Sequence, residues 1–341
     1  MVRLPLVTVL LGVLLAGGSS ARAGDDQTLI ERRPLVLERD GVWLGRGVCY
    51  GPHRDGQTPD GGPQPTREQV REDMHLLDSR FDLVRIYGSG EAAEFALDAI
   101  ERDHLGLRVM LGAWIGPESG DTEIDPERDA NEDQVSELIR IANAHPGTVL
   151  AVNVGNETQV FWSGHKIARE RLIAYIREVR AAVSVPVTTC DDFNFWNKPE
   201  SDAVAAEVDF IGLHAYGMWN GQTLVDALSW TRAQIDDVGS KHPGLPVVHA
   251  ESGWATRKHT EGEQATLIKG EPGEKQQELY YRAYTSWAQE AQQAYFFFEA
   301  FDEKWKGGAH PDEVEKHWGL WNSDRTAKLA VDVELPGEGE E

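Results

Sequence analysis

Apolar segments of strand length alternate with amphipathic segments of helix length along almost the whole chain. Eight runs are typical of buried parallel strands, because they are short, apolar and bounded by turn residues. The expected strands are residues 45–50, 83–87, 107–114, 149–154, 185–190, 210–215, 245–251 and 294–301. The expected helices are residues 67–79, 91–103, 131–144, 167–183, 225–241 and 275–292, with a shorter one at 199–206. Thr66 and Gln69 have the spacing of a capping box at the start of the first helix.

Eight strands that alternate with helices form either a closed barrel or an open, doubly wound sheet. An open sheet gathers its site at one switch point, whereas a barrel collects side chains from the ends of many strands. Several expected strands end in polar or aromatic residues, either in the strand or directly after it: Tyr50, Arg85, Tyr87, Asn156, Glu157, Asp191, His214, Tyr216, Glu251 and Glu299. We therefore predict an α/β fold with a single (β/α)8 TIM barrel.

The composition along the chain predicts four segments. Residues 1–23 have a basic start, a short apolar run and small residues before a cleavage point near Ala23, which is typical of a signal peptide. This predicts a secreted or periplasmic protein, and the run is too short to span a membrane. Residues 24–33 are expected to be loose, and residues 34–328 to form the barrel after a hairpin turned at Asp40-Gly41 that closes its bottom. Residues 329–341 hold five acids and no base, which predicts a disordered tail.

Charge and cysteine content limit the possible partners. The chain has a formal net charge of −24, so its surface repels nucleic acid and anionic lipid. We expect no nucleic-acid partner, no membrane span in the mature chain, and a monomer. Cys49 and Cys190 fall at the ends of the first and fifth strands, too far apart for a disulfide, so both are expected to be free and buried.

Cofactor and metal motifs are weak or missing. Gly88, Gly90 and Ala93 have a dinucleotide-like spacing, but the next strand ends without the acid that would hold a ribose. A tight turn between strand and helix explains these glycines. The sequence contains no HExxH, P-loop, CxxC or GxSxG motif, and its eleven histidines show no ligand spacing. We predict that the protein needs neither a metal nor a cofactor.

Two glutamates, Glu157 and Glu251, each close a buried strand. Either one alone could be an ordinary loop residue, but strands four and seven should carry both carboxyl groups to the same rim of a barrel. Two carboxyl groups about 5–5.5 Å apart are what a retaining glycosidase requires. Asn156 can bind a sugar hydroxyl beside the first, and Arg85 can keep a carboxylate ionised.

Tryptophans also gather near the expected strand ends: Trp114, Trp162, Trp196, Trp219, Trp254, Trp305 and Trp321. Flat apolar side chains with scattered hydrogen-bonding groups form the walls of a sugar-binding groove. We expect about half of these side chains to cap the core instead.

Six stretches of the chain, in order, resemble the signatures of glycoside hydrolase family 17. They are Gly47-Val-Cys-Tyr-Gly51, Val84-Arg-Ile-Tyr-Gly88, Val154-Gly-Asn-Glu157, Glu251-Ser-Gly-Trp254, Phe298-Glu-Ala-Phe-Asp-Glu-Lys-Trp-Lys306 and His317-Trp-Gly-Leu-Trp321. This family comprises β-1,3-glucanases and related β-glucan transglycosylases, which share a (β/α)8 barrel and a retaining mechanism. Cys49 departs from the pattern, because plant and fungal members commonly have Asn there, and this leaves the substrate linkage open.

The resemblance implies that Glu157 is the acid/base and Glu251 the nucleophile of a double displacement on a β-glucan polysaccharide or oligosaccharide. Glu299, Glu303 and Lys304 fall where the family has a supporting cluster of acids and a base. Arg85 and Tyr216 are the candidates for holding Glu251 ionised. The expected substrate-binding residues are Tyr50, Arg85, Tyr87, Asn156, His214, Tyr216, Trp219, Trp254, Glu299, Phe301, Glu303, Lys304 and Trp321.

Two other functions remain open at this level. A transglycosylase would use the same glutamates with an aromatic acceptor site, for which Trp219 and Trp321 are candidates. A barrel that only binds glucan would need no proton donor facing a nucleophile. The sequence also leaves open whether cleavage is internal or terminal, and whether the bond is β-1,3 or β-1,6.

Overall fold

The fold is a closed barrel of eight parallel strands, seen in a computed structural model that describes residues 30–118 and 125–333. The order around the barrel is β10-β3-β4-β5-β6-β7-β8-β9, so each strand pairs with the next along the chain and the last pairs with the first. The strands are β3 (Arg46–Tyr50), β4 (Leu83–Ile86), β5 (Arg108–Ala113), β6 (Val149–Asn156), β7 (Val187–Asp192), β8 (Ile211–His214), β9 (Val247–Ser252) and β10 (Tyr295–Phe297). The predicted TIM barrel is confirmed.

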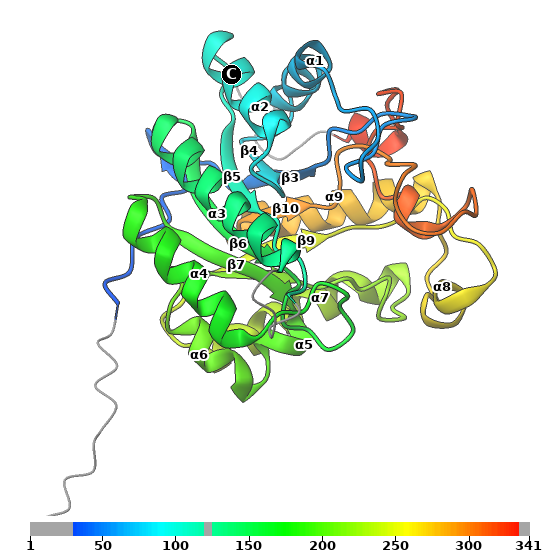
Figure 1. The fold of residues 1–341 in the computed structure, drawn as a ribbon. Helices are drawn as coiled ribbons and strands as arrows, with labels where there is room; N and C mark the ends of the chain where they lie inside the picture. Colours follow the sequence, from blue (N-terminus) through cyan, green and yellow to red (C-terminus); the bar gives the residue numbers. More distant parts are fainter. Residues whose placement is uncertain (1–29, 119–124, 334–341) are drawn as a thin grey trace, which may run out of the picture. The chain divides into compact units, whose positions relative to one another are not determined.

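Helices alternate with the strands and surround them (Figure 1). The long helices are α1 (Arg67–Asp78), α2 (Glu91–Arg102), α3 (Pro126–Ala144), α4 (Arg169–Ala182), α7 (Leu224–Lys241) and α9 (Glu274–Ala291). The short helices are α5 (Phe193–Trp196), α6 (Asp202–Ala205) and α8 (Gly262–Leu267). Thr66 and Gln69 form the predicted capping box of α1. Helix α3 starts at Pro126 instead of residue 131, because Asp125 caps it and proline is well suited to the first helical position.

The predicted hairpin is present at the start of the described chain. Strands β1 (Glu38–Arg39) and β2 (Val42–Trp43) pair in antiparallel fashion around Asp40 and Gly41, which both have positive φ. Arg39 lines a surface cavity together with Asp82 and Gly106, which precede β4 and β5. The hairpin therefore adjoins the N-terminal ends of these two strands.

Both ends of the barrel segment extend further than predicted. Arg33 was expected to be loose, but its backbone N–H donates to Asp209 at 2.7 Å and its guanidinium donates to the carbonyl of Val185 at 2.9 Å. At the other end, Leu329–Asp332 form a 3-10 helix, and Val333 is buried. The prediction of a disordered tail is therefore wrong for residues 329–333, because Ala330 and Val333 are buried and Val331 packs against the core.

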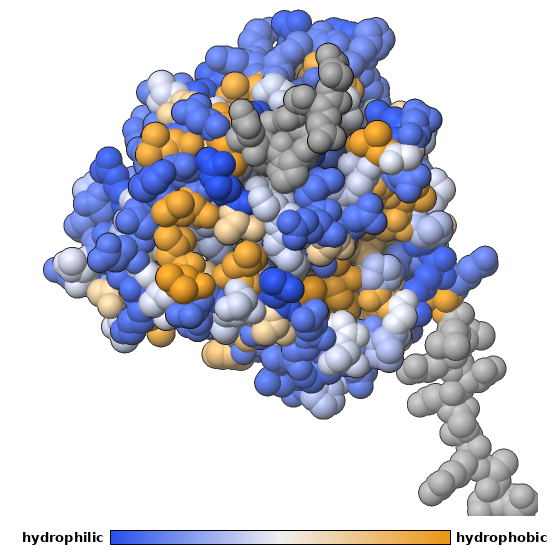
Figure 2. Space-filling model, turned by 180° about the vertical axis from the view of Figure 1, so that it is seen from behind, coloured by the Kyte–Doolittle hydropathy of each residue, from blue (hydrophilic) through white to orange (hydrophobic). Residues whose placement is uncertain are grey.

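The predicted signal peptide at 1–23, the rest of the loose segment at 24–29 and the remaining tail at 334–341 lie outside the described residues. No helix in the described part of the chain is long and apolar enough to cross a membrane. Hydrophilic residues dominate the face shown in Figure 2, and apolar residues form separate patches on it. Cys49 and Cys190 are buried and free, as predicted.

Candidate active site

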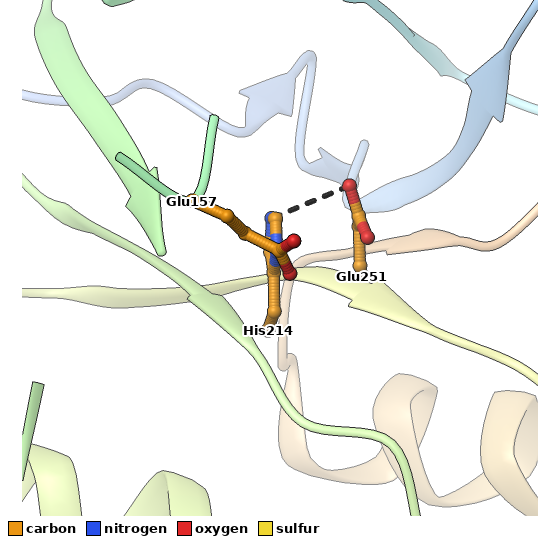
Figure 3. Close-up of side chains that lie close together, drawn as sticks. All are labelled: Glu157, His214 and Glu251. Carbon is orange, nitrogen blue, oxygen red and sulfur yellow. Dashed lines mark hydrogen bonds and ion pairs between the residues drawn. The ribbon is translucent and has the colours of Figure 1, made fainter. Parts of the chain in front are cut away.

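The two predicted glutamates meet at the C-terminal mouth of the barrel. Glu251 belongs to β9, and Glu157 directly follows β6. One carboxylate oxygen of each lies within 4.8 Å of the other and of a ring nitrogen of His214. Figure 3 shows both glutamate side chains directed toward the imidazole of His214, which comes from the end of β8. The geometric prediction that strands four and seven bring their carboxyl groups together is confirmed.

A sharp turn at the end of β6 places Glu157. Gly155 has φ +80° and Glu157 has φ +52°, so the chain turns through the left-handed region twice within three residues. Glycine adopts this conformation freely, but a glutamate does so only where the surroundings hold it. The N–H of Glu157 still donates to the carbonyl of Cys190 at 2.9 Å, which anchors the turn to β7.

Three donors hold the carboxylate of Glu251. Its Oε1 accepts from Arg85 Nη1 at 2.6 Å and from the Tyr87 hydroxyl at 2.8 Å, and its Oε2 accepts from the Tyr216 hydroxyl at 2.7 Å. Burial alone would raise the pKa of Glu251, but His214, Arg85 and the two tyrosine hydroxyls outweigh it and lower the pKa below its ordinary value. Glu251 is therefore a stable carboxylate at neutral pH.

Glu157 has the opposite protonation state. Burial, followed by the negative charges of Glu251 and Asp192, raises the pKa of Glu157 well above its ordinary value, and Arg85 opposes this rise. Its Oε1 lies 2.8 Å from Nδ1 of His214. Glu157 therefore keeps its proton at a pH where Glu251 is ionised.

His214 and Arg85 connect the two glutamates. Both side chains are fully buried. Nε2 of His214 lies 3.1 Å from Arg85 Nη1 and 3.4 Å from Glu251 Oε1. Arg85 Nη2 donates to Asn156 Oδ1 at 2.6 Å, so Asn156 retains its amide nitrogen as a donor for another group.

The cluster of Glu157, His214 and Glu251 has enough ligand atoms for a metal ion. Arg85, however, already supplies a cation 2.6 Å from Glu251. A divalent ion at the same carboxylate would face the repulsion of a buried guanidinium. The residues present therefore fit a carboxylate pair balanced by an arginine better than a metal site.

The sequence profile of the BtgE/BtgC glycoside hydrolase domain matches residues 47–319 of the chain, a range that includes both glutamates and every residue around them. The chain belongs to this family. The resemblance to glycoside hydrolase family 17 is thereby confirmed, and the protein is a glycosidase.

Two curated relatives of this glycoside hydrolase illustrate the range of the family. A glucan 1,3-beta-glucosidase of Arthroderma benhamiae is 26% identical over 301 residues, which cover 82% of this chain and 88% of that protein. The glucan endo-1,3-beta-glucosidase btgC of Emericella nidulans is 26% identical over 290 residues, which cover 79% of this chain and only 42% of that protein. The chain thus spans nearly the whole length of the first relative and less than half of the second.

Solved structures agree with the fold of this glycoside hydrolase. An endo-laminarinase from Formosa has a TM-score of 0.73 at 23% identity, covering 84% of this chain and 86% of its own. A family 17 β-1,3-glucanosyltransferase from Rhizomucor miehei has a TM-score of 0.68 at 23% identity, covering 86% and 98%. At this level of identity the likeness establishes the common barrel.

A second charged cluster follows β10, with one correction to the sequence analysis. Lys306 Nζ contacts Glu299 Oε2 at 2.6 Å and Glu303 Oε2 at 2.8 Å, whereas Lys304 pairs with Asp55 at the surface. The spacing of three residues between Glu303 and Lys306 was the signal that could have identified Lys306. Burial opposes ionisation of Glu303, but Lys306 outweighs it and lowers the pKa of Glu303 to about 2.

Glu315 is a further residue near the site that the sequence analysis missed. Its Oε1 accepts from Nε1 of the predicted Trp219 at 3.1 Å. Burial is the main cause that raises the pKa of Glu315, and the charge of Glu251 adds to it. No spacing rule marks Glu315, because it lies in a single-turn 3-10 helix, Val314–Lys316, after the last strand.

Four predicted binding residues are core residues instead: Tyr50, Trp254, Phe301 and Trp321, none more than 3% exposed. The Tyr50 hydroxyl donates to Asp73 at 3.0 Å, and the Trp321 ring packs against Phe301 with centroids 5.7 Å apart. Such side chains present no face to a sugar. The acceptor site expected from Trp219 and Trp321 is therefore wrong in its second member.

Other aromatic side chains lie exposed on the loops that follow β5 and β6. Phe161 and Trp162 come four and five residues after Glu157 and are 74% and 52% exposed. Trp114 follows β5, is 38% exposed and packs edge-on against His165 with ring centroids 4.7 Å apart. Trp114 and Trp162 were expected near a groove, whereas Phe161 was missed. The exposed aromatic residues thus lie on the loops after two neighbouring strands, β5 and β6, the second of which leads into Glu157.

Proposed function

We propose that this protein is a retaining hydrolase of β-1,3-linked glucan. The observation that carries the proposal is the pair Glu157 and Glu251, whose carboxylate oxygens approach within 4.8 Å and whose pKa values are displaced in opposite directions. A close pair with one proton donor and one ionised carboxylate is the arrangement of a retaining glycosidase. The names of the curated relatives support β-1,3-glucan as the substrate.

In the first step, Glu251 attacks the anomeric carbon and forms a covalent bond to the sugar. The bond between that carbon and the glycosidic oxygen breaks, and Glu157 transfers its proton to the departing oxygen. The negative charge of Glu251 disappears in the ester, so the pKa of Glu157 falls and Glu157 becomes a base. In the second step, Glu157 takes a proton from water while the water oxygen displaces Glu251 and restores both groups.

The surrounding residues support this division of roles. Arg85, Tyr87 and Tyr216 stabilise the carboxylate of Glu251 through hydrogen bonds of 2.6–2.8 Å. Arg85 also orients Asn156, whose amide nitrogen is suited to a hydroxyl of the sugar. A barrel that only binds glucan would gain nothing from a proton donor held beside an ionised nucleophile.

Replacement of each glutamate tests the proposal. Glu251→Ala should abolish turnover of a soluble β-1,3-glucan, because no nucleophile remains. Glu157→Ala should retain activity on an aryl glucoside with a good leaving group and should be accelerated by azide, which needs no base. Near-normal glucan turnover by Glu251→Ala would refute the assignment.

A panel of defined oligoglucans, with products sized, would give the linkage and show whether cleavage is internal or terminal.

Transglycosylation is the second candidate, in which a sugar replaces water in the second step. The exposed Phe161 and Trp162 favour it, because exposed aromatic faces on the loop that follows the acid/base can bind an acceptor sugar. At high oligosaccharide concentration, products longer than the substrate would indicate transfer. If Phe161→Ala and Trp162→Ala both leave the ratio of transfer to hydrolysis unchanged, these side chains are not the acceptor site.

We further propose that the protein is exported as a monomer after cleavage near Ala23. Arg3, the apolar run and the small residues that follow support export. The N-terminal sequence of the extracellular protein should begin at Gly24. Light scattering of the purified protein should give the mass of one chain.

A further inference from the structure

Asp191, near the end of β7, is a buried acid that the proposed reaction does not use. Its side chain is fully buried. Its Oδ2 accepts from the backbone N–H of Gln159 at 2.8 Å. Its Oδ1 accepts from the N–H of Val160 at 3.2 Å and of Asp192 at 2.8 Å. The carboxylate thus binds the chain two and three residues beyond Glu157.

The turn at Glu157 lies between two attachments to β7. Before it, the N–H of Glu157 bonds the carbonyl of Cys190, and after it the N–H groups of Gln159 and Val160 bond Asp191. Glu157 itself has φ +52°, a conformation that costs roughly 1–3 kcal/mol for a residue other than glycine. A backbone in this region persists where both sides of it are fixed.

From these contacts we infer that Asp191 is a positioning residue for Glu157, which fixes the direction in which the proton donor points. The inference rests on the proposed role of Glu157 as acid/base. Asp191 acts through the backbone of the turn and does not touch the substrate.

A carboxylate suits this task better than a neutral side chain. It has acceptor sites for three N–H groups, and hydrogen bonds to a charged acceptor are roughly twice as strong as neutral ones. An asparagine would turn one acceptor into a donor that faces backbone N–H groups. Burial, and then the charge of Glu157, raise the pKa of Asp191 to about 8, whereas the N–H groups of Gln159 and Asp192 oppose the rise and favour the ionised form, which accepts from all three N–H groups.

A positioning role and a merely structural role differ in one measurable way. A displaced proton donor slows only those reactions whose leaving group needs a proton. A smaller fraction of folded protein lowers the measured rates of all reactions by the same factor. The ratio of kcat/KM for two substrates, measured on one preparation, therefore does not depend on how much of the protein is folded.

The test compares Asp191→Asn with the unchanged protein on two substrates. One is a β-1,3-linked gluco-oligosaccharide, and the other is a 2,4-dinitrophenyl β-laminaribioside, whose leaving group departs without a proton. We expect kcat/KM for the oligosaccharide to fall about 10- to 100-fold, as for a misplaced catalytic group, and that for the dinitrophenyl glycoside to stay nearly unchanged. An equal fall for both substrates would overturn the inference.

Asp209 provides a matched control. It is also buried, and its carboxylate accepts from the backbone N–H of Val187 at 2.8 Å and of Arg33 at 2.7 Å, at the opposite end of the barrel. Asp209→Asn should therefore leave the ratio of the two substrates unchanged, whatever it does to stability. Glu157→Ala is measured in parallel: if it shows no dependence on the leaving group, the proposed function fails, and this outcome is distinct from failure of Asp191→Asn alone.

A measurement on the unchanged protein covers the case in which Asp191→Asn does not fold. The N–H groups of Gln159 and Val160 bond a buried acceptor, so they should exchange with deuterium as slowly as the amides of β6. Exchange at the rate of an unprotected loop would show that Asp191 does not hold the turn.

Discussion

At the scale of single residues, Glu157 and Glu251 are chemically identical side chains made different by their neighbours. The carboxylate of Glu251 accepts hydrogen bonds from Arg85, Tyr87 and Tyr216. The carboxyl group of Glu157 instead lies within hydrogen-bond distance of Nδ1 of His214. Burial, and then the charge of Glu251, raise the pKa of Glu157. The division into nucleophile and proton donor therefore follows from the placement of a few donors.

Loss of one hydroxyl should move the pH profile in a predictable direction. Tyr216→Phe removes a hydrogen bond to the ionised form of Glu251, so the pKa of Glu251 rises and the acidic limb of kcat/KM moves to higher pH. The loss of a hydrogen bond to a charged group should lower kcat/KM roughly 10- to 100-fold.

Tyr175→Phe is the control, because Tyr175 makes a similar bond of 2.6 Å to Glu118, outside the carboxylate pair. If Tyr216→Phe and Tyr175→Phe give the same dependence of kcat/KM on pH, the proposed role of Tyr216 is contradicted.

At the scale of elements, the segment after β10 contains a buried ion-pair cluster centred on Lys306. This lysine contacts both Glu299 and Glu303, which are almost fully buried. Burial raises the pKa of Glu299 well above its ordinary value, so the charge of Lys306 balances that of Glu303. Removal of one partner from a buried ion pair leaves an uncompensated charge, which usually costs about 3–5 kcal/mol.

Lys306→Met should accordingly lower the free energy of unfolding by about 3–5 kcal/mol near neutral pH, measured by denaturant titration. The pKa of Glu303 is depressed to about 2, so its contribution to stability is present above the ordinary carboxyl pKa of 4.5 and is lost as the pH falls toward 2. The difference between the two proteins should shrink over the same range.

Lys304→Met is the matched control, since Lys304 forms an exposed ion pair with Asp55. Such a pair contributes at most about 1 kcal/mol. Equal losses from both substitutions would mean that Lys306 has no special role.

At the scale of the whole molecule, the barrel is held together without a disulfide. Cys49 and Cys190 are both fully buried, and burial is the first cause that raises the pKa of the Cys49 thiol. Packing of the strands and helices around one core therefore supplies the stability.

Two measurements check this description of the whole molecule. The midpoint of thermal unfolding should be the same with and without a reducing agent, and a thiol reagent should label the two cysteines only after unfolding. The protein unfolded in denaturant serves as the reference, because both of its thiols should react with the reagent. A midpoint that falls on reduction, or rapid labelling of the native protein, would contradict the free and buried assignment.

Local sequence by itself determined the eight strands, the long helices between them, and the positions of Glu157 and Glu251 at strand ends, because hydrophobic periodicity and turn residues are local signals. Only the tertiary structure decided which polar residues meet. Lys306 instead of Lys304 reaches the buried acids, Trp321 and Phe301 pack inward, and Asp191 binds the turn beyond Glu157. These outcomes depend on side-chain direction and on contacts between segments far apart in the chain, which periodicity does not encode.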